Sequence, residues 1–146
     1  MSQEPELRSI DRLLAQICHM HHGRARTLLQ GIGLYRGQPP LLDILHESEG
    51  LSHTELATRL RVVPATVTKM LQRMEKAGFV LRQPDREDER VSRVYLTDAG
   101  RAIRAEMDAA LRSLAADTFA GFTPDECGEL QRLLLRVHEN LARVTE

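Results

Sequence analysis

The chain has 146 residues, of which 42% are hydrophobic and 28% are charged, and its formal net charge is −1 at pH 7. This composition is typical of a folded domain that buries a core of its own and excludes a disordered tail. No apolar run reaches the roughly 20 residues that a membrane span needs, and no segment has the pattern of a secretory signal, so we expect a cytoplasmic protein without a membrane partner.

The N-terminal part of the chain predicts two helices. Apolar residues recur at helical spacing from about Leu7 to Leu29, which indicates one long amphipathic helix. Three glycines between residues 31 and 37 end this helix. The pair Pro39-Pro40 fits the first turn of a second helix that ends near Glu49.

The next segment predicts a helix-turn-helix. Ser52 and Glu55 are spaced as a capping box, in which each side chain binds a free amide at the start of a helix. We expect this helix to be short and to reach about Leu60. A tight turn follows, and Pro64 suits the first position of another helix that stops at Gly78.

The apolar period then changes from 3.6 to 2, which predicts strands over residues 79–82 and 91–96. The polar and charged segment between them is typical of a hairpin tip. Thr97 can cap a long helix, and Thr123 and Glu126 form a second capping box before the last helix. The predicted fold class is mostly α with a small β-hairpin wing, a winged helix-turn-helix between long terminal helices.

The terminal helices carry apolar stripes that exceed what one small winged domain can cover. We therefore expect them to pack against a second copy in a homodimer. The alternative is a monomer in which the first and last helices pack on each other. The expected organisation is a dimerisation helix over residues 1–32, a winged helix-turn-helix domain over residues 33–100 and dimerisation helices over residues 101–146.

Charge is distributed unevenly along the chain. Residues 59–101 hold ten Lys and Arg against six Asp and Glu, whereas the rest of the chain has an acidic excess. A basic middle segment between acidic ends favours one surface that faces a polyanion. The alternative is a solvated helix face with chance clustering of charge.

The second helix of a helix-turn-helix enters the major groove, where methyl groups contact thymine, Gln pairs with adenine, and Arg or Lys suits guanine or phosphate. The candidate reading residues are Ala65, Thr66, Thr68, Lys69, Gln72 and Arg73. Ser52 and Thr54 begin the preceding helix and are candidate phosphate contacts. The candidate wing residues are Arg86, Asp88, Arg90 and Arg93, with Asp88 placed to hold the Arg90 guanidinium for a minor groove.

Several linked motifs occur in one order along the chain. They are Gly33-Leu34 with Gln38, Leu56-Ala57 with Leu60, Val67-Thr68-Lys69, Leu71 with Met74-Glu75 and Gly78-Phe79-Val80, Asp85 with Asp88 and Arg90, and Leu96-Thr97 with Gly100. Together they resemble the MarR family of bacterial transcription regulators. The resemblance implies a homodimer that binds a pseudo-palindromic operator on double-stranded DNA, with repression relieved by a small ligand or by oxidation.

Three further features point to regulation. Met20, Arg24, Tyr35 and Arg36 are candidate residues of an effector pocket. Cys18 is a candidate redox sensor, and with the nearby histidines it suggests a metal-responsive alternative, although too few ligands share one helix face to predict a metal. We predict no cofactor.

No nucleophile elbow or glycine-rich phosphate loop occurs, so we expect no enzyme. The alternative function, from a different class of protein, is a winged helix that binds other proteins and does not read DNA.

Overall fold

The computed structural model describes residues 3–145, and these divide into two compact units, one up to residue 111 and one from residue 112 onward. The fold is mostly helical with one small sheet, which confirms the predicted class. The elements in chain order are α1 (Gln3–Gly31), α2 (Gln38–Glu47), β1 (Leu51–Ser52), α3 (His53–Leu60), α4 (Pro64–Lys76), β2 (Val80–Pro84), β3 (Ser92–Leu96), α5 (Asp98–Thr118) and α6 (Pro124–Thr145).

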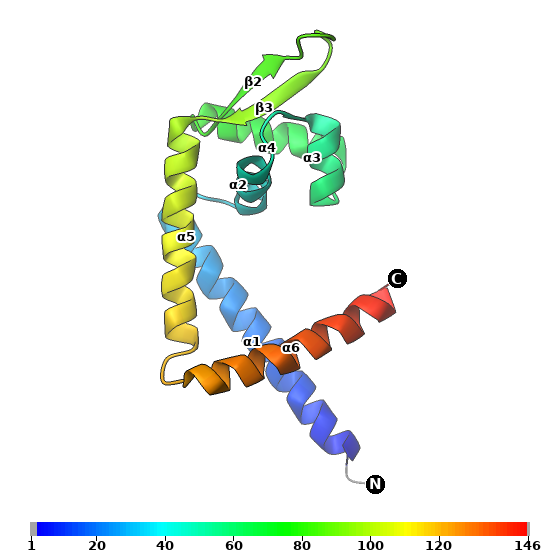
Figure 1. The fold of residues 1–146 in the computed structure, drawn as a ribbon, viewed down its shortest axis with the longest axis vertical. Helices are drawn as coiled ribbons and strands as arrows, with labels where there is room; N and C mark the ends of the chain where they lie inside the picture. The colour runs from blue at the N-terminus through cyan, green and yellow to red at the C-terminus, as the bar shows by residue number, and fades with distance from the viewer. Residues whose placement is uncertain (1–2, 146) are drawn as a thin grey trace. The chain divides into compact units, whose positions relative to one another are not determined.

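The core of the first unit lies among α2, α3, α4, the sheet and the first part of α5, and Figure 1 shows α2, α3, α4 and the sheet grouped together. The apolar residues that helical spacing places on one side of each helix are the residues that become buried. The fully buried side chains include Leu41, Leu42, Leu45, Leu56, Val67, Leu71, Met74 and Val94. Burying a side chain of this size stabilises the fold by about 1.5–3 kcal/mol, so these contacts fix the helix-turn-helix geometry.

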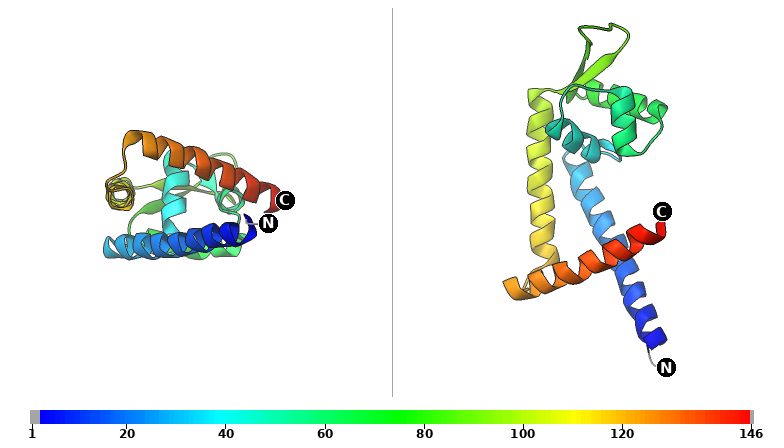
Figure 2. Two further views of the ribbon diagram at one scale, coloured as in Figure 1. Left: turned by 90° about the horizontal axis from the view of Figure 1, so that it is seen from below. Right: turned by 45° about the vertical axis from the view of Figure 1, so that its right-hand side comes forward.

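The wing is part of a three-stranded antiparallel sheet with the order β1-β3-β2. Val80 pairs with Leu96 at the base of the hairpin, and the tip of β2–β3 extends away from α3 and α4 (Figure 2). The two-stranded prediction missed β1, in which Leu51 pairs with Val94. This short strand ties the start of the helix-turn-helix directly to the wing.

The start of α5 is fastened to the segment between α4 and β2. Thr97 accepts a hydrogen bond from the Gly100 amide at 3.0 Å, and its hydroxyl donates to the carbonyl oxygen of Gly78. Gly100 is buried, and a Cβ atom at this position would collide with the carbonyl oxygen of Phe79. A close approach of two backbones therefore requires glycine here.

The second unit contains the end of α5 and the whole of α6. The predicted capping box at its turn is present, because the Thr123 amide donates to Glu126 and the Glu126 amide donates to the Thr123 hydroxyl. None of the described residues of α6 is buried. Within residues 3–145, no helix is long and apolar enough to cross a membrane.

Candidate nucleic-acid interface

Helix α4 has one face buried in the core and one face exposed to solvent. Val67, Leu71 and Met74 are fully buried. Five of the six predicted reading residues are exposed to solvent; they are Ala65, Thr66, Lys69, Gln72 and Arg73. An amphipathic helix of 13 residues with this division presents one face to a groove while the other holds it to the domain.

Thr68, the sixth predicted reading residue, is half-buried at the edge of this face. Its hydroxyl donates to the carbonyl oxygen of Pro64 at 3.1 Å, and its Oγ1 atom lies 3.5 Å from Nδ1 of His53 on α3. The hydroxyl is therefore held on the protein side. No side chain caps the start of α4, because the N-cap residue is Val63, and the Val63 carbonyl oxygen accepts hydrogen bonds from the amides of Thr66 and Val67.

The predicted capping box at α3 is present. The Glu55 amide donates to Ser52 Oγ at 3.2 Å, and the Ser52 amide donates to the Glu55 carboxylate at 3.3 Å. Ser52 and Thr54 line an open hollow of about 370 Å³ together with Arg90 from the wing. The structure thus brings together residues that the sequence assigned separately to phosphate and to the wing.

The wing holds Arg90 as the sequence predicted. Its Nε atom donates to Asp88 Oδ1 at 3.0 Å and its Nη2 donates to Asp88 Oδ2 at 3.3 Å. The side chain of Arg90 is nevertheless 90% exposed. Hydrogen bonding to this guanidinium holds the pKa of Asp88 below its usual value. A paired but exposed guanidinium is oriented and still free to approach a polyanion on its open side.

Arg93 occupies a different environment from the other wing cations. Its Nε atom donates to Asp85 Oδ1 at 2.7 Å, and its Nη1 donates to the carbonyl oxygen of Gly50 at 2.9 Å. Asp85 also accepts hydrogen bonds from the amides of Glu87 and Asp88. These partners make Arg93 a structural link between the start of the wing loop and the segment before β1, while Arg86 is exposed in that loop.

A second ion pair connects the recognition helix to the wing and was not predicted. Arg82 on β2 donates to both carboxylate oxygens of Glu75 on α4, at 2.7 and 2.8 Å. The hydrogen bond to Glu75 raises the pKa of Arg82. Glu75 is near the end of α4 and Arg82 is in the following strand, so only the turn at Gly78 brings them together. Sequence spacing alone carries no signal of this contact.

A cavity of about 430 Å³ lies where α1 ends and α2 begins. Tyr35 and Arg36, two of the four predicted pocket residues, line this cavity. Met20 and Arg24 are not among its lining residues, and Met20 is 71% exposed. The other lining residues are His22, Ala25, Arg26, Leu29, Leu34, Gly37, Pro39 and Pro40.

The two cysteines, Cys18 and Cys127, are both exposed free thiols. No group of three or more His, Cys, Asp or Glu side chains within residues 3–145 is arranged to hold a metal ion. The described residues around Cys18 therefore include neither a disulfide partner nor a set of metal ligands.

The comparisons with known proteins agree on one family. A family model described as MarR family matches residues 34–92. The transcriptional regulator TtmR of Methylorubrum extorquens is 39% identical over 125 residues, which are 85% of this chain and 60% of TtmR, so the chain spans less than two thirds of that relative. The transcriptional repressor IacR of Pseudomonas putida is 33% identical over 82% of this chain and 74% of its own length.

A crystal structure of a cysteine-to-serine mutant of MarR from E. coli in complex with operator DNA has the same fold. Its TM-score is 0.69 at 26% identity, and the match covers 90% of this chain and 95% of that chain. Residues 34–92, which the family model matches, contain the helix-turn-helix and most of the wing described above. The chain belongs to the MarR family of transcriptional regulators.

Proposed function

We propose that this protein is a sequence-specific regulator of transcription, a repressor, that binds a pseudo-palindromic operator in double-stranded DNA. The observation that carries this proposal is the exposed face of α4, on which five potential base-reading side chains stand over a fully buried seam. The operator complex of E. coli MarR supports it. Because its relatives are named as regulators, we propose no catalytic activity, and a partner in chromosomal DNA favours the cytoplasm.

In this proposal, residues 33–100 bind the DNA. Helix α4 enters the major groove, with Lys69 and its neighbours at the base edges. Arg90 approaches the flanking minor groove, where the negative potential attracts a guanidinium. Ser52 and Thr54 contact the phosphate backbone, since the Ser52 oxygen accepts from Glu55 while its hydroxyl hydrogen remains available.

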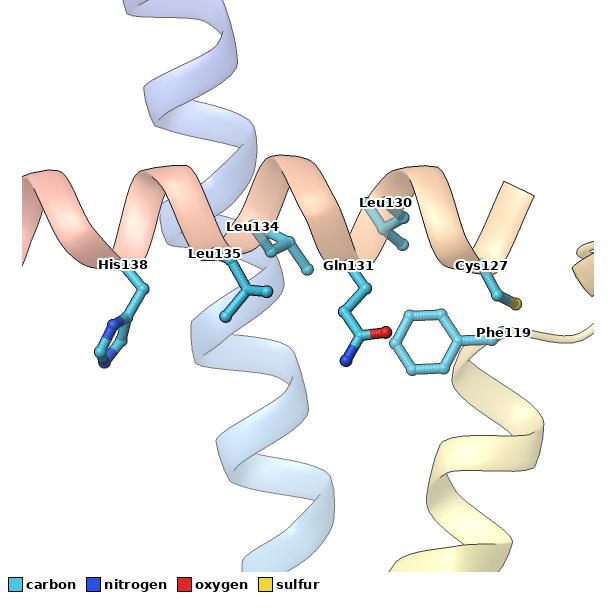
Figure 3. A pocket seen from close by; sticks show the side chains of 7 residues that line it. All are labelled: Phe119, Cys127, Leu130, Gln131, Leu134, Leu135 and His138. Carbon is cyan, nitrogen blue, oxygen red and sulfur yellow. The ribbon is translucent and has the colours of Figure 1, made fainter. Parts of the chain in front are cut away.

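We propose that residues 1–32 and 101–146 form the dimer. Helix α1 exposes a row of apolar side chains that includes Leu7, Ile10 and Ile17. In the second unit, Phe119 extends along α6 toward Gln131 beside an open apolar cavity of about 420 Å³ (Figure 3). Apolar rows of this extent on a monomer are typical of surfaces that pair with a second copy.

We also propose that a small ligand modulates DNA binding from the cavity between α1 and α2. Arg26 and Arg36 supply two cations, and Tyr35, Leu34 and the prolines supply apolar walls. This combination suits an anionic ligand with an apolar body. Ligand binding there changes operator affinity only to the extent that the ligand prefers one of two conformations.

The test is selection of bound sequences from a random duplex library, followed by binding measurements over a range of salt concentrations. Recovery of a pseudo-palindrome with half-sites about one helical turn apart, together with a dimer mass in light scattering, supports the proposal. Weak, salt-sensitive binding without any enriched sequence overturns it and favours a protein-interaction module. The Arg132→Ala variant, changed at an exposed residue of α6, is the control and, with a dimer mass in light scattering, should select the same sequence.

A further inference from the structure

His53 is a partly buried histidine beneath the recognition helix, and the proposed function gives it no role. It is the first residue of α3, and its Nδ1 atom lies 3.5 Å from Oγ1 of Thr68 on α4. Its Nε2 atom is buried and has no hydrogen-bond partner among the residues that the structure describes. A buried polar atom without a partner calls for an explanation in terms of its protonation state.

The hydrogen bonds of Thr68 determine which nitrogen carries the proton. A hydroxyl group has one hydrogen, and that of Thr68 points to the carbonyl oxygen of Pro64 at 3.1 Å. Toward His53 the Thr68 oxygen can therefore only accept. The neutral ring then has its hydrogen on Nδ1 and leaves Nε2 as a bare acceptor, which is the cheaper atom to bury unpaired.

The surroundings of His53 oppose a second proton. Burial and the positive charge of Arg82 on β2 lower the pKa of His53 below its ordinary 6.5, while Glu75 on α4 raises it by less. Each carboxylate oxygen of Glu75 already accepts a hydrogen bond from Arg82. A second cation nearby is Arg90, which lines the same hollow as His53.

We infer that His53 is a positioning residue for the recognition helix, which holds Thr68 in its reading geometry only while the imidazole is uncharged. A proton on Nε2 would place an N–H group in a buried site without an acceptor, facing a guanidinium. The charged ring relieves this by turning into the open hollow that His53 lines, which breaks its contact with Thr68 and releases that side chain. Acidification therefore weakens operator reading, and this inference rests on the proposed DNA-binding function.

The lowered pKa of His53 determines the direction in which operator affinity changes with pH. The unfolded chain takes up the proton at about pH 6.5, and the folded domain takes it up only at a lower pH. The neutral, reading-competent form is thus fully present above 6.5 and is lost as the pH falls through the folded value. Below that value, affinity should fall by up to about tenfold for each pH unit.

The first experiment needs no DNA. Long-range proton–nitrogen NMR of the full-length protein at neutral pH should find His53 protonated at Nδ1, with a titration midpoint below 6.5. The opposite tautomer, or a midpoint above 6.5, overturns the inference and leaves the proposed function untouched. Conversely, a wild-type protein that binds no selected sequence at pH 8 overturns the proposed function whatever the NMR result.

The second experiment compares operator binding from pH 8 to pH 5 in wild type and His53→Gln. Glutamine can donate one hydrogen bond to Thr68 and does not titrate, so the two proteins should bind within about twofold at pH 8. Wild type alone should then lose affinity in acid, while circular dichroism shows both to be folded. Parallel profiles, or a gain of affinity by wild type in acid, contradict the inference.

Thr68→Val supplies the specific readout and Thr66→Val supplies its control. Valine at position 68 keeps the shape but removes the oxygen that His53 contacts, so His53→Gln should have no further effect on the pH profile in this background. Thr66 is exposed on the same helix turn, and among the described residues its side chain makes no hydrogen bond to His53. In the Thr66→Val background the His53→Gln effect should persist in full.

Discussion

The Nε atom of Arg93 donates to Oδ1 of Asp85 at 2.7 Å, so an ion pair joins β3 to the residue that follows β2. The same guanidinium reaches the carbonyl oxygen of Gly50, just before β1. One side chain thus joins the hairpin to the start of the helix-turn-helix. The Glu75–Arg82 ion pair is a second link, and it joins the wing to α4.

Asp85→Asn should weaken operator binding even though it makes the protein less negative. The amide cannot hold the guanidinium as the carboxylate does, so Arg93 and the start of the wing loop lose their fixed geometry. Affinity measured by fluorescence anisotropy should fall several-fold. Glu87→Gln removes the same charge from an exposed neighbour and should bind as tightly as wild type or more so. Equal behaviour of the two variants would refute the structural role of Asp85.

The carboxyl group of Asp85 should titrate below its ordinary pKa of 3.8, since hydrogen bonds from Arg93 and from two wing amides favour its charged form. The ion pair is therefore present above 3.8 and is lost only as the pH falls through the lowered value. Carbon NMR of the side chain measures this midpoint. In Arg93→Gln the pKa should move up toward 3.8, and an unchanged midpoint would mean that Arg93 is not its cause.

Arg90→Ala should reduce affinity for every DNA sequence. Loss of one cation near the phosphates lowers the slope of log affinity against log salt by about one. The measurement is a binding titration at several salt concentrations, with both selected and random duplexes. Arg132 pairs with Glu129 on α6, in the proposed dimerisation region and away from the proposed DNA contacts, so an Arg132→Ala protein with a dimer mass in light scattering should keep the wild-type slope. A wild-type slope in Arg90→Ala would remove the wing from the DNA contact.

Lys69→Ala should change which operator is preferred. If the ammonium group reads a guanine, its loss costs about 1–3 kcal/mol at one base position and relaxes selectivity there. Repeated sequence selection with the variant measures this directly. Lys76→Ala at the end of the same helix serves as the comparison and should retain the wild-type preference. A uniform loss on all sequences would assign Lys69 to phosphate.

Gly100→Ala should destabilise the first unit severely. The new methyl group would strike the carbonyl oxygen of Phe79, which is backbone and cannot rotate away. Overpacking of this kind costs about 1–3 kcal/mol or more, which thermal unfolding measures. Gly128 on α6 has no neighbouring atom within 4 Å of an added methyl, so Gly128→Ala should stabilise its helix by about 1 kcal/mol. Similar melting of the two variants would contradict the close approach at Gly100.

Features that depend on local chemistry could be predicted from the sequence. The Ser52–Glu55 box starts α3 and Pro64 starts α4, because caps and proline act through adjacent residues. The Asp88–Arg90 pair was predicted for the same reason, since only one residue separates them.

Features that depend on tertiary contacts could not be predicted. Strand β1 has two residues, too few to show a period, and exists because Leu51 meets Val94 across the sheet. The assignment of Arg93 to DNA rested on its charge alone, whereas its partners Asp85 and Gly50 come from a loop and from a segment 43 positions away. The proposed positioning role of His53 likewise needs Thr68, 15 positions later, and the wing strand that carries Arg82.

The two faces of α4 also have a consequence for how such a protein diverges. Val67, Leu71 and Met74 hold the domain together, while Lys69, Gln72 and their outward neighbours have no part in the core. Substitutions on the outward face therefore carry little penalty in stability. A gene duplicate can acquire a new operator by a few such changes, without first having to repair its fold.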